Sequence, residues 1–216
     1  MSRELITALD NFIQNFYHGG SLSEAEARET IEEGLLELVW KNGKHAANGL
    51  LVTESGYFIT SDHCVDQEHL SQLQVRDHRN KRYEIEKVLV RGKGDLDIAL
   101  VKAEMPFIDI ARRYRFRNSV DKIDNIPVAL LTRRNGEIVR KYGLIPSFRD
   151  HSSHFYHTNI NCVPGDSGGI ILTPTFQPIG ILRGTNNSHT YNSKAVDFFK
   201  ALELIHFYKS RLESRL

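Results

Sequence analysis

The 216-residue chain is 40% hydrophobic and 25% charged, an ordinary balance for a soluble globular protein of about one domain. Its formal net charge of +1 argues against a general electrostatic grip on nucleic acid. No apolar run approaches the roughly 20 residues that span a bilayer, and Glu4, Asp10 and Gln14 interrupt the apolar residues at the N-terminus, so we expect neither a membrane span nor a signal peptide.

Cysteine usage suggests a compartment. The chain has two cysteines, Cys64 and Cys162, whereas a secreted protein of this size would usually carry several paired ones. We expect two free thiols and a cytoplasmic location, in the producing cell or, after delivery, in a host cell. Basic residues cluster at 112–117, 133–134 and 140–141, and we interpret these clusters as solvated loops.

Residues 1–34 carry helical signals. Apolar residues from Leu5 to Phe16 have the spacing of one helical face. Ser23 and Glu26 then have the spacing of a capping box, followed by helix-forming residues. We predict a helical N-terminal extension folded as a hairpin. It is either a packing appendage or a docking segment for a regulatory partner or for the active site.

Residues 35–216 have a different pattern, with short β-like runs separated by turns and a helical period over 195–212. Asn42-Gly43, Ser55-Gly56, Arg79-Asn80 and Asn135-Gly136 are typical turn pairs. We therefore predict one β domain, a barrel or pair of barrels, with a C-terminal helix. The predicted strands cover 35–40, 49–53, 57–60, 73–76, 83–90, 98–102, 126–131, 138–145, 155–159, 169–172 and 178–183.

A serine between glycines is the main chemical signal. In Gly165-Asp166-Ser167-Gly168-Gly169 the glycines allow backbone angles closed to other residues, so a loop there can turn its amide N–H groups inward. Taken alone, the stretch could equally be a tight turn before a core strand. The rest of the chain must supply a base and an orienting carboxylate for a catalytic interpretation.

Both groups are present in order. His63 follows the apolar run 57–60, and Asp97 directly precedes the strand predicted at 98–102, so both lie at strand ends. A serine hydroxyl needs a neighbouring base, which imidazole provides near neutral pH. We assign Ser167 as nucleophile, His63 as general base and acid, and Asp97 as the carboxylate that orients the imidazole. The amides of Gly165 and Ser167 would form the oxyanion hole.

These motifs resemble the trypsin-like serine proteases of chymotrypsin fold, and more closely the compact bacterial HtrA-like branch, over roughly residues 35–210. The segments that carry the resemblance are Gly49–Val52, Ser55–Thr60 with His63-Cys64-Val65, Asp97–Val101, and Thr158-Asn159 with Pro164–Gly169. The resemblance implies a mainly β double barrel with a cleft between the barrels, endopeptidase activity on proteins or peptides through an acyl-enzyme, and no cofactor. No PDZ domain follows, so peptide tethering is not implied.

The sequence also departs from that family. Asp62 stands where a small residue usually precedes the histidine, and Asp166 lacks the new N-terminus that partners it in zymogen-derived relatives. By the family's spacing, Asn161 and Cys162 would lie at the base of the specificity pocket, with Arg183 and Thr185 on its opposite wall. No acidic residue is expected at that base, so a trypsin-like preference for Arg or Lys is not supported, and Arg183 would favour an acidic or polar side chain.

Alternatives follow from these departures. The chain could be a catalytically silent interaction module, with its site disturbed by Asp62 or its cleft filled by the helices of 1–34. It could also be a latent protease activated by a partner or by removal of 1–34. His151, His154 and His157 are three residues apart, but no carboxylate or thiol completes a set, so we predict ordinary surface histidines and no metal site.

Overall fold

The computed structural model describes residues 3–18, 22–92, 96–106, 125–146, 155–185 and 193–214. Its helices are α1 (Arg3–His18), α2 (Glu24–Gly34) and α3 (Phe198–Glu213), with 3₁₀ turns at Asp62–Val65 and Leu70–Gln72. The first six strands are β1 (Leu35–Trp40), β2 (His45–Leu51), β3 (Tyr57–Thr60), β4 (Leu73–Arg76), β5 (Arg82–Arg91) and β6 (Ala99–Ala103). The next six are β7 (Ile126–Arg134), β8 (Glu137–Ile145), β9 (Phe155–Thr158), β10 (Ile170–Leu172), β11 (Pro178–Thr185) and β12 (Ser193–Asp197).

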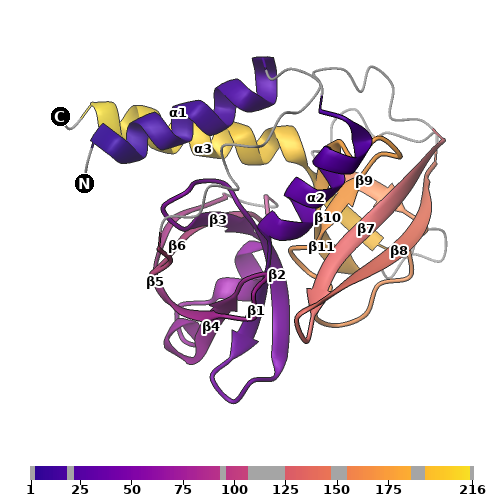
Figure 1. Cartoon of the computed structure of the whole chain (residues 1–216), viewed down its shortest axis with the longest axis horizontal. Coiled ribbons are helices and arrows are strands. Elements are labelled where there is room, and N and C mark those ends of the chain that lie inside the picture. The colour runs from indigo at the N-terminus through magenta and orange to yellow at the C-terminus, as the bar shows by residue number, and fades with distance from the viewer. Residues whose placement is uncertain are drawn as a thin grey trace.

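The strands form two units that lie side by side (Figure 1). Strands β1–β6 close into a barrel in the order β1-β2-β3-β6-β5-β4, and the others form a curved sheet in the order β8-β7-β10-β11-β12-β9. The outer strands of that sheet approach each other, because the side-chain oxygen of Asn159, just after β9, accepts a 2.7 Å hydrogen bond from the amide of Leu144 in β8. The expected mainly β double barrel with N- and C-terminal helices is confirmed.

Local sequence signals explain the turns. Asn135 and Gly136, the two residues between β7 and β8, have φ of 53° and 85°. This left-handed pair matches the twist of a two-residue hairpin, which is why Asn-Gly is common there. The β7–β8 hairpin that results is long and regular, with pairs from Ile126–Ile145 to Arg134–Glu137.

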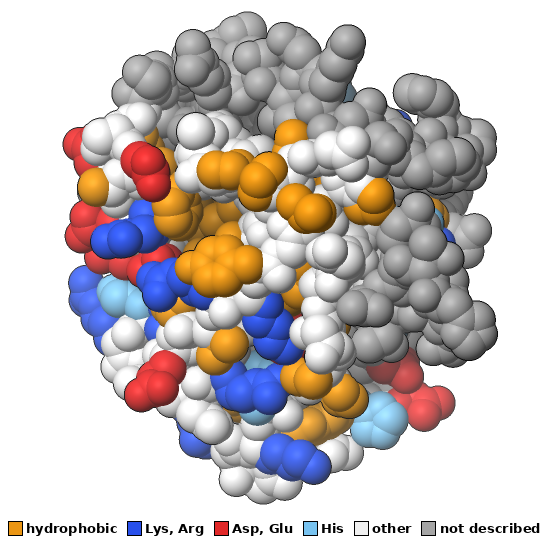
Figure 2. Space-filling model, turned by 90° about the vertical axis from the view of Figure 1, so that its right-hand side faces the viewer, with side chains coloured by type: hydrophobic (Ala, Val, Ile, Leu, Met, Phe, Trp, Pro, Cys, Tyr) orange, Lys and Arg blue, Asp and Glu red, His pale blue; other side chains and the backbone are white. Residues whose placement is uncertain are grey.

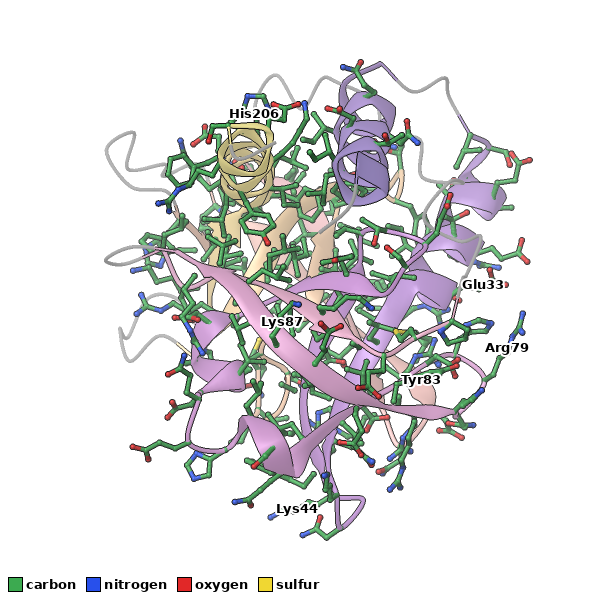
Figure 3. The ribbon with its side chains drawn as sticks, turned by 90° about the vertical axis from the view of Figure 1, so that its left-hand side faces the viewer. Glu33, Lys44, Arg79, Tyr83, Lys87 and His206 are labelled. Carbon is green, nitrogen blue, oxygen red and sulfur yellow. The ribbon has the colours of Figure 1, made fainter. Side chains whose placement is uncertain are left out.

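The two N-terminal helices do not form the hairpin predicted. The capping box of α2 is present, with the Ser23 hydroxyl accepting from the Glu26 amide and the Glu26 carboxylate accepting from the Ser23 amide. Helix α1, however, packs along α3, as Figures 1 and 3 show, whereas α2 packs on β1 and β2. Leu9 and Phe12 of α1 are fully buried in the same core as α3, so the apolar face of α1 is satisfied by α3 instead of α2.

The C-terminal helix begins later than predicted. Residues 193–197 form β12, which pairs with β11 on one side and β9 on the other, and α3 starts only at Phe198. Ala195 and Val196 are buried inside this sheet. The apolar spacing at Val196 fits a helix, but the hydrogen bonds that these residues form with β9 and β11 on both sides favour a strand. Figure 3 shows α3 above the first barrel, with His206 on the helix and Lys44 at the opposite end of the molecule.

Candidate active site

A pocket of about 650 Å³ brings together His63, Asp97 and Ser167. His63 follows β3 and Asp97 precedes β6 in the first barrel, while Ser167 precedes β10 in the second sheet. The described residues that line the pocket are Asp62, His63, Leu96 and Asp97 from the first barrel, and Val163, Pro164, Ser167, Arg183, Gly184 and Lys194 from the second sheet. The pocket therefore lies where the two halves meet.

His63 and Asp97 form a close pair. Nδ1 of His63 lies 2.6 Å from Oδ2 of Asp97, and the His63 amide donates to Oδ1 at 2.9 Å. The hydrogen bond to Asp97, with a smaller contribution from Cys64, raises the pKa of His63 to about 10. Burial acts to raise the pKa of Asp97, but the hydrogen bonds from His63 outweigh it and hold that pKa below its ordinary value. Asp97 is thus an ionised carboxylate that fixes the imidazole ring.

The turn that carries His63 is tied to both halves of the protein. The hydroxyl of Ser61, which is fully buried, donates to the Leu182 carbonyl of β11 at 2.8 Å. Asp62 forms an ion pair with Arg91, which also donates to the Val65 carbonyl at 2.7 Å. The charge of Asp62, unusual next to a base, is therefore engaged by Arg91.

The hydroxyl of Ser167 and the free ring nitrogen of His63 have other partners in this structure. Oγ of Ser167 donates to the Arg183 carbonyl at 3.1 Å, and Nε2 of His63 lies 3.4 Å from Sγ of Cys64. A rotation of the Ser167 side chain would be needed for it to meet His63. Loose hydrogen bonds of this kind are common in sites without substrate. The role of Cys64 could not be read from the sequence, since it depends on the 3₁₀ turn.

The amides of the serine loop divide into two groups. Those of Val163, Asp166, Gly168 and Gly169 donate to partners within the loop or in β11. Those of Gly165 and Ser167 donate to nothing in the part of the chain that the structure describes. Buried or half-buried amides normally find an acceptor, so these two N–H groups are available for an oxygen supplied by a ligand.

Glycine is required at Gly168 for a steric reason. Its φ is 76°, and a Cβ there would come within 1.9 Å of the Asn48 carbonyl oxygen in β2. This close approach lets the loop contact the first barrel, where the Asn48 amide donates to the Ser167 carbonyl at 2.8 Å. The nucleophile candidate is thereby fixed against the half of the protein that carries His63.

The basic residues of the β7–β8 hairpin are not all solvated, contrary to our interpretation. Arg133 is 4% exposed. Lys141 and Arg134 form ion pairs with Asp166 at 2.5 and 3.3 Å, and the Asp166 side chain is 2% exposed. Strand β10 pairs antiparallel with β7, with Ile170 opposite Leu131, so the loop that precedes β10 lies beside the end of β7. Asp166 thus has internal partners that the sequence order did not reveal.

The predicted specificity residues are not brought together as a group. Arg183 lines the pocket, with Nε at 3.6 Å from Oδ2 of Asp97. Cys162 is buried in the core of the second sheet, and burial raises its pKa. Asn161 is exposed and is not among the described residues that line the pocket. The side chain of Thr185 lies outside the described residues. Lys194, which we did not predict, does line the pocket.

Comparison with known families decides the relationship. Residues 47–181 match the trypsin-like peptidase domain. The chain belongs to the trypsin-like peptidase family. No curated protein sequence shows significant similarity to this trypsin-like peptidase.

Solved structures show the same fold at low sequence identity. An HtrA-type protease, AlgW with a decapeptide, is 15% identical with a TM-score of 0.65, over 87% of this chain and 67% of that one. The serine endoprotease from Yersinia pestis is also 15% identical with a TM-score of 0.65, over 88% of this chain and 68% of that one. These likenesses establish the fold of this trypsin-like peptidase.

None of the described helices is long and apolar enough to cross a bilayer. Within the described ranges, no group of three or more His, Cys, Asp or Glu is arranged to hold a metal ion. Of the three histidines considered in the sequence, His157 lies in β9, and His151 and His154 lie outside the described residues.

Proposed function

We propose that this trypsin-like peptidase is a serine endopeptidase in which Ser167, His63 and Asp97 form the catalytic triad. The observation that carries the proposal is the single pocket shared by the His63–Asp97 pair and Ser167, beside two amides without a described acceptor. The family and the two protease structures support a peptide as substrate. Neither a cofactor nor a metal enters the proposed reaction.

The chemistry follows from the positions of these groups. Oγ of Ser167 turns from the Arg183 carbonyl, attacks the peptide carbonyl carbon and passes its proton to Nε2 of His63. The amides of Gly165 and Ser167 receive the negative charge on the substrate oxygen, and Asp97 stabilises the imidazolium. His63 then gives the proton to the leaving amine, which departs from the acyl-enzyme. A water molecule, deprotonated by His63, hydrolyses the ester and regenerates Ser167.

The structure does not favour the silent interaction module. Two features could silence the site, namely a disturbing charge at Asp62 and helices lying in the cleft. Asp62 is paired with Arg91, and no described residue of α1 or α2 lines the pocket. Latency controlled by residues 1–34 or by a partner stays a prediction. The division into an extension of 1–34 and a domain of 35–216 also stays one, although α2 ends at Gly34 and β1 begins at Leu35.

We further propose a preference for acidic substrate side chains and a cytoplasmic site of action. Asp62 is held by Arg91, and Asp97 by His63 and Arg183, so their negative charges are compensated. Lys194 has no carboxylate partner among the described residues; its Nζ lies 3.7 Å from the centroid of the Phe155 ring. A cation without a counter-ion in the pocket favours an anionic side chain. The free thiols of Cys64 and Cys162 fit a reducing compartment.

A fluorophosphonate reagent tests the proposed reaction, since it needs an activated serine but no known substrate sequence. Intact-mass measurement of the full chain should show one adduct, and Ser167→Ala should show none. Adducts of equal yield in both proteins would overturn the assignment of Ser167. Absence of an adduct in the folded wild type would count against an enzyme that is active without a partner. A His63→Ala variant provides a second control, because the serine there keeps its loop but loses its base.

A further inference from the structure

The peptide bond between Pro164 and Gly165 has a fixed orientation. Nη2 of Arg134 lies 3.1 Å from the Pro164 carbonyl oxygen and 3.3 Å from Oδ1 of Asp166. The described chain contains no cis peptide bond. In a trans peptide the carbonyl and the following N–H point in opposite directions. Because Arg134 holds the Pro164 carbonyl on the hairpin side of the loop, the Gly165 N–H is turned away from the hairpin.

We infer that Arg134 is a positioning residue, which holds the Pro164–Gly165 peptide so that the Gly165 N–H faces the substrate oxygen. This inference rests on the proposed serine protease reaction and names the residue that sets up its oxyanion hole. Rotation of this one peptide would exchange the N–H for the Pro164 carbonyl, placing a negative partial charge where the reaction requires a positive one. Arg134 opposes that rotation because the carbonyl would lose its cationic donor.

The two hairpin cations that pair with Asp166 have separable roles. Lys141 of β8 contacts the carboxylate of Asp166 at 2.5 Å, and no bond from it to a loop carbonyl is present among the described residues. Arg134 of β7 contacts both that carboxylate and the Pro164 carbonyl. Lys141 thus compensates the buried charge of Asp166, and Arg134 adds the contact that orients the peptide. Figure 2 shows Lys and Arg side chains among hydrophobic ones on the face of the molecule that carries this hairpin.

The next peptide of the loop is held from the first barrel. The Gly165 carbonyl lies 2.8 Å from Nε2 of His45 and accepts from Nδ2 of Asn48 at 2.9 Å. Gly165 has φ of 94°, and a Cβ there would come within 2.6 Å of the His45 ring. His45 in turn contacts the buried carboxylate of Glu37 at 2.8 Å. The first barrel thus holds the carbonyl of Gly165. Arg134, from the second sheet, sets the orientation of the preceding Pro164–Gly165 peptide.

Kinetics on matched variants test the inference, with fluorescently labelled casein as the probe substrate. Arg134→Met should lower kcat by about 100-fold, the loss typical of removing one oxyanion donor, while KM changes by less than about threefold because ground-state binding is untouched. Arg134→Lys retains a cationic donor and should recover part of kcat. Arg140→Met removes a hairpin arginine that pairs with Glu32, away from the loop, and should leave kcat unchanged.

The outcomes separate the inference from the proposed function. A folded Arg134→Met enzyme with wild-type kcat would overturn the inference while leaving the triad intact. A loss of kcat in Lys141→Met equal to that in Arg134→Met would also overturn it, because charge compensation alone would then explain the effect.

Crystal structures provide a readout that does not depend on activity. In Arg134→Met the Pro164 carbonyl should turn toward Ser167, whereas in the wild type and Arg140→Met it should face the hairpin. An unchanged peptide in Arg134→Met would overturn the inference even if the wild type proved inactive toward casein and fluorophosphonate. Inactivity of the wild type would count against the proposed function, and the crystal structures would still decide the role of Arg134.

Discussion

Nε2 of His63 lies 3.4 Å from Sγ of Cys64, the next residue in the chain. The 3₁₀ turn Asp62–Val65 folds the thiol back onto the ring nitrogen that the proposed mechanism uses to accept the Ser167 proton. The contact also adds to the effect of Asp97 in raising the pKa of His63. Cys64 therefore competes with Ser167 for the base and favours its protonated form.

Replacement of this thiol should make the base more available. A general base must be neutral, so the rate should rise with pH through the pKa of His63. Cys64→Ala removes the second contribution to that raised pKa, and the acidic limb of the kcat/KM profile should move to lower pH. Cys162→Ala removes a thiol from the core of the second sheet and should leave the limb in place. Coincident limbs for wild type and Cys64→Ala would contradict the prediction.

Asp97→Asn tests the other partner of the imidazole. An amide keeps the shape of the side chain but removes the negative charge, so the pKa of His63 should fall toward its ordinary value. The loss of tautomer control should lower kcat by about 10⁴-fold, while the Ser167 loop stays folded. Steady-state kinetics and a pH profile measure both effects. A kcat within tenfold of the wild type would show that Asp97 is not the orienting carboxylate.

The sequence could predict most strands, the turns and three residues that line one pocket, because each lies in a local pattern. Asn135-Gly136 needs left-handed backbone, Ser23 and Glu26 cap their own helix, and His63 ends its own strand. The order of these motifs then carries the resemblance to a known family.

What could not be predicted depends on contacts between distant segments. The partners of Asp166 are separated from it by 25 and 32 positions, and they reach it because β10, which follows the serine loop, pairs with β7 of the hairpin. The sequence predicts helix from residue 195 because a short apolar run fits either period, whereas residues 193–197 form β12. The choice of strand over helix depends on pairing with β9 and β11, which the local sequence pattern does not indicate.

Lys194 is the residue to change for substrate preference. Its ammonium lines the pocket and has no carboxylate partner among the described residues, so it should attract an acidic side chain. Lys194→Met should lower kcat/KM for peptides with Asp or Glu in this subsite by about tenfold, as expected for one charged hydrogen bond of roughly 1.4 kcal/mol. A peptide library profiled with both proteins measures the change. Equal profiles would remove Lys194 from the subsite.

Glu37 should contribute to stability in a pH-dependent way. Its side chain is fully buried, and burial acts to raise its pKa, but hydrogen bonds from His45 and from the amides of Gly136 and Asn135 hold the pKa below its ordinary value. A lowered folded pKa gives stability that is present above the unfolded value and is lost as pH falls through the folded value. Glu37→Gln should cost about 3 kcal/mol at pH 7, and the difference should shrink in acid.

Urea denaturation at several pH values measures this effect. Glu84→Gln is the matched control, because Glu84 pairs with Lys41 at the surface and should cost less than about 1 kcal/mol. A Glu37→Gln protein as stable as the wild type at pH 7 would contradict the proposed contribution of the buried carboxylate.

We expect Arg133 to stabilise the contact between the N-terminal extension and the second sheet. Its guanidinium donates to the carbonyls of Glu32, Leu35 and Gly136 at 2.6, 2.9 and 2.7 Å, which ties the end of α2 and the start of β1 to the hairpin. Arg133→Met leaves three carbonyls without this donor and should cost about 3 kcal/mol, or a fall in Tm of about 10 °C. Arg140→Met, at an exposed pair with Glu32, should cost less than about 1 kcal/mol.

Calorimetry measures this loss of stability, and parallel kinetics test latency. A rise in kcat at unchanged Tm in Arg133→Met would mean that α2 restrains the active site and does not serve as part of the fold.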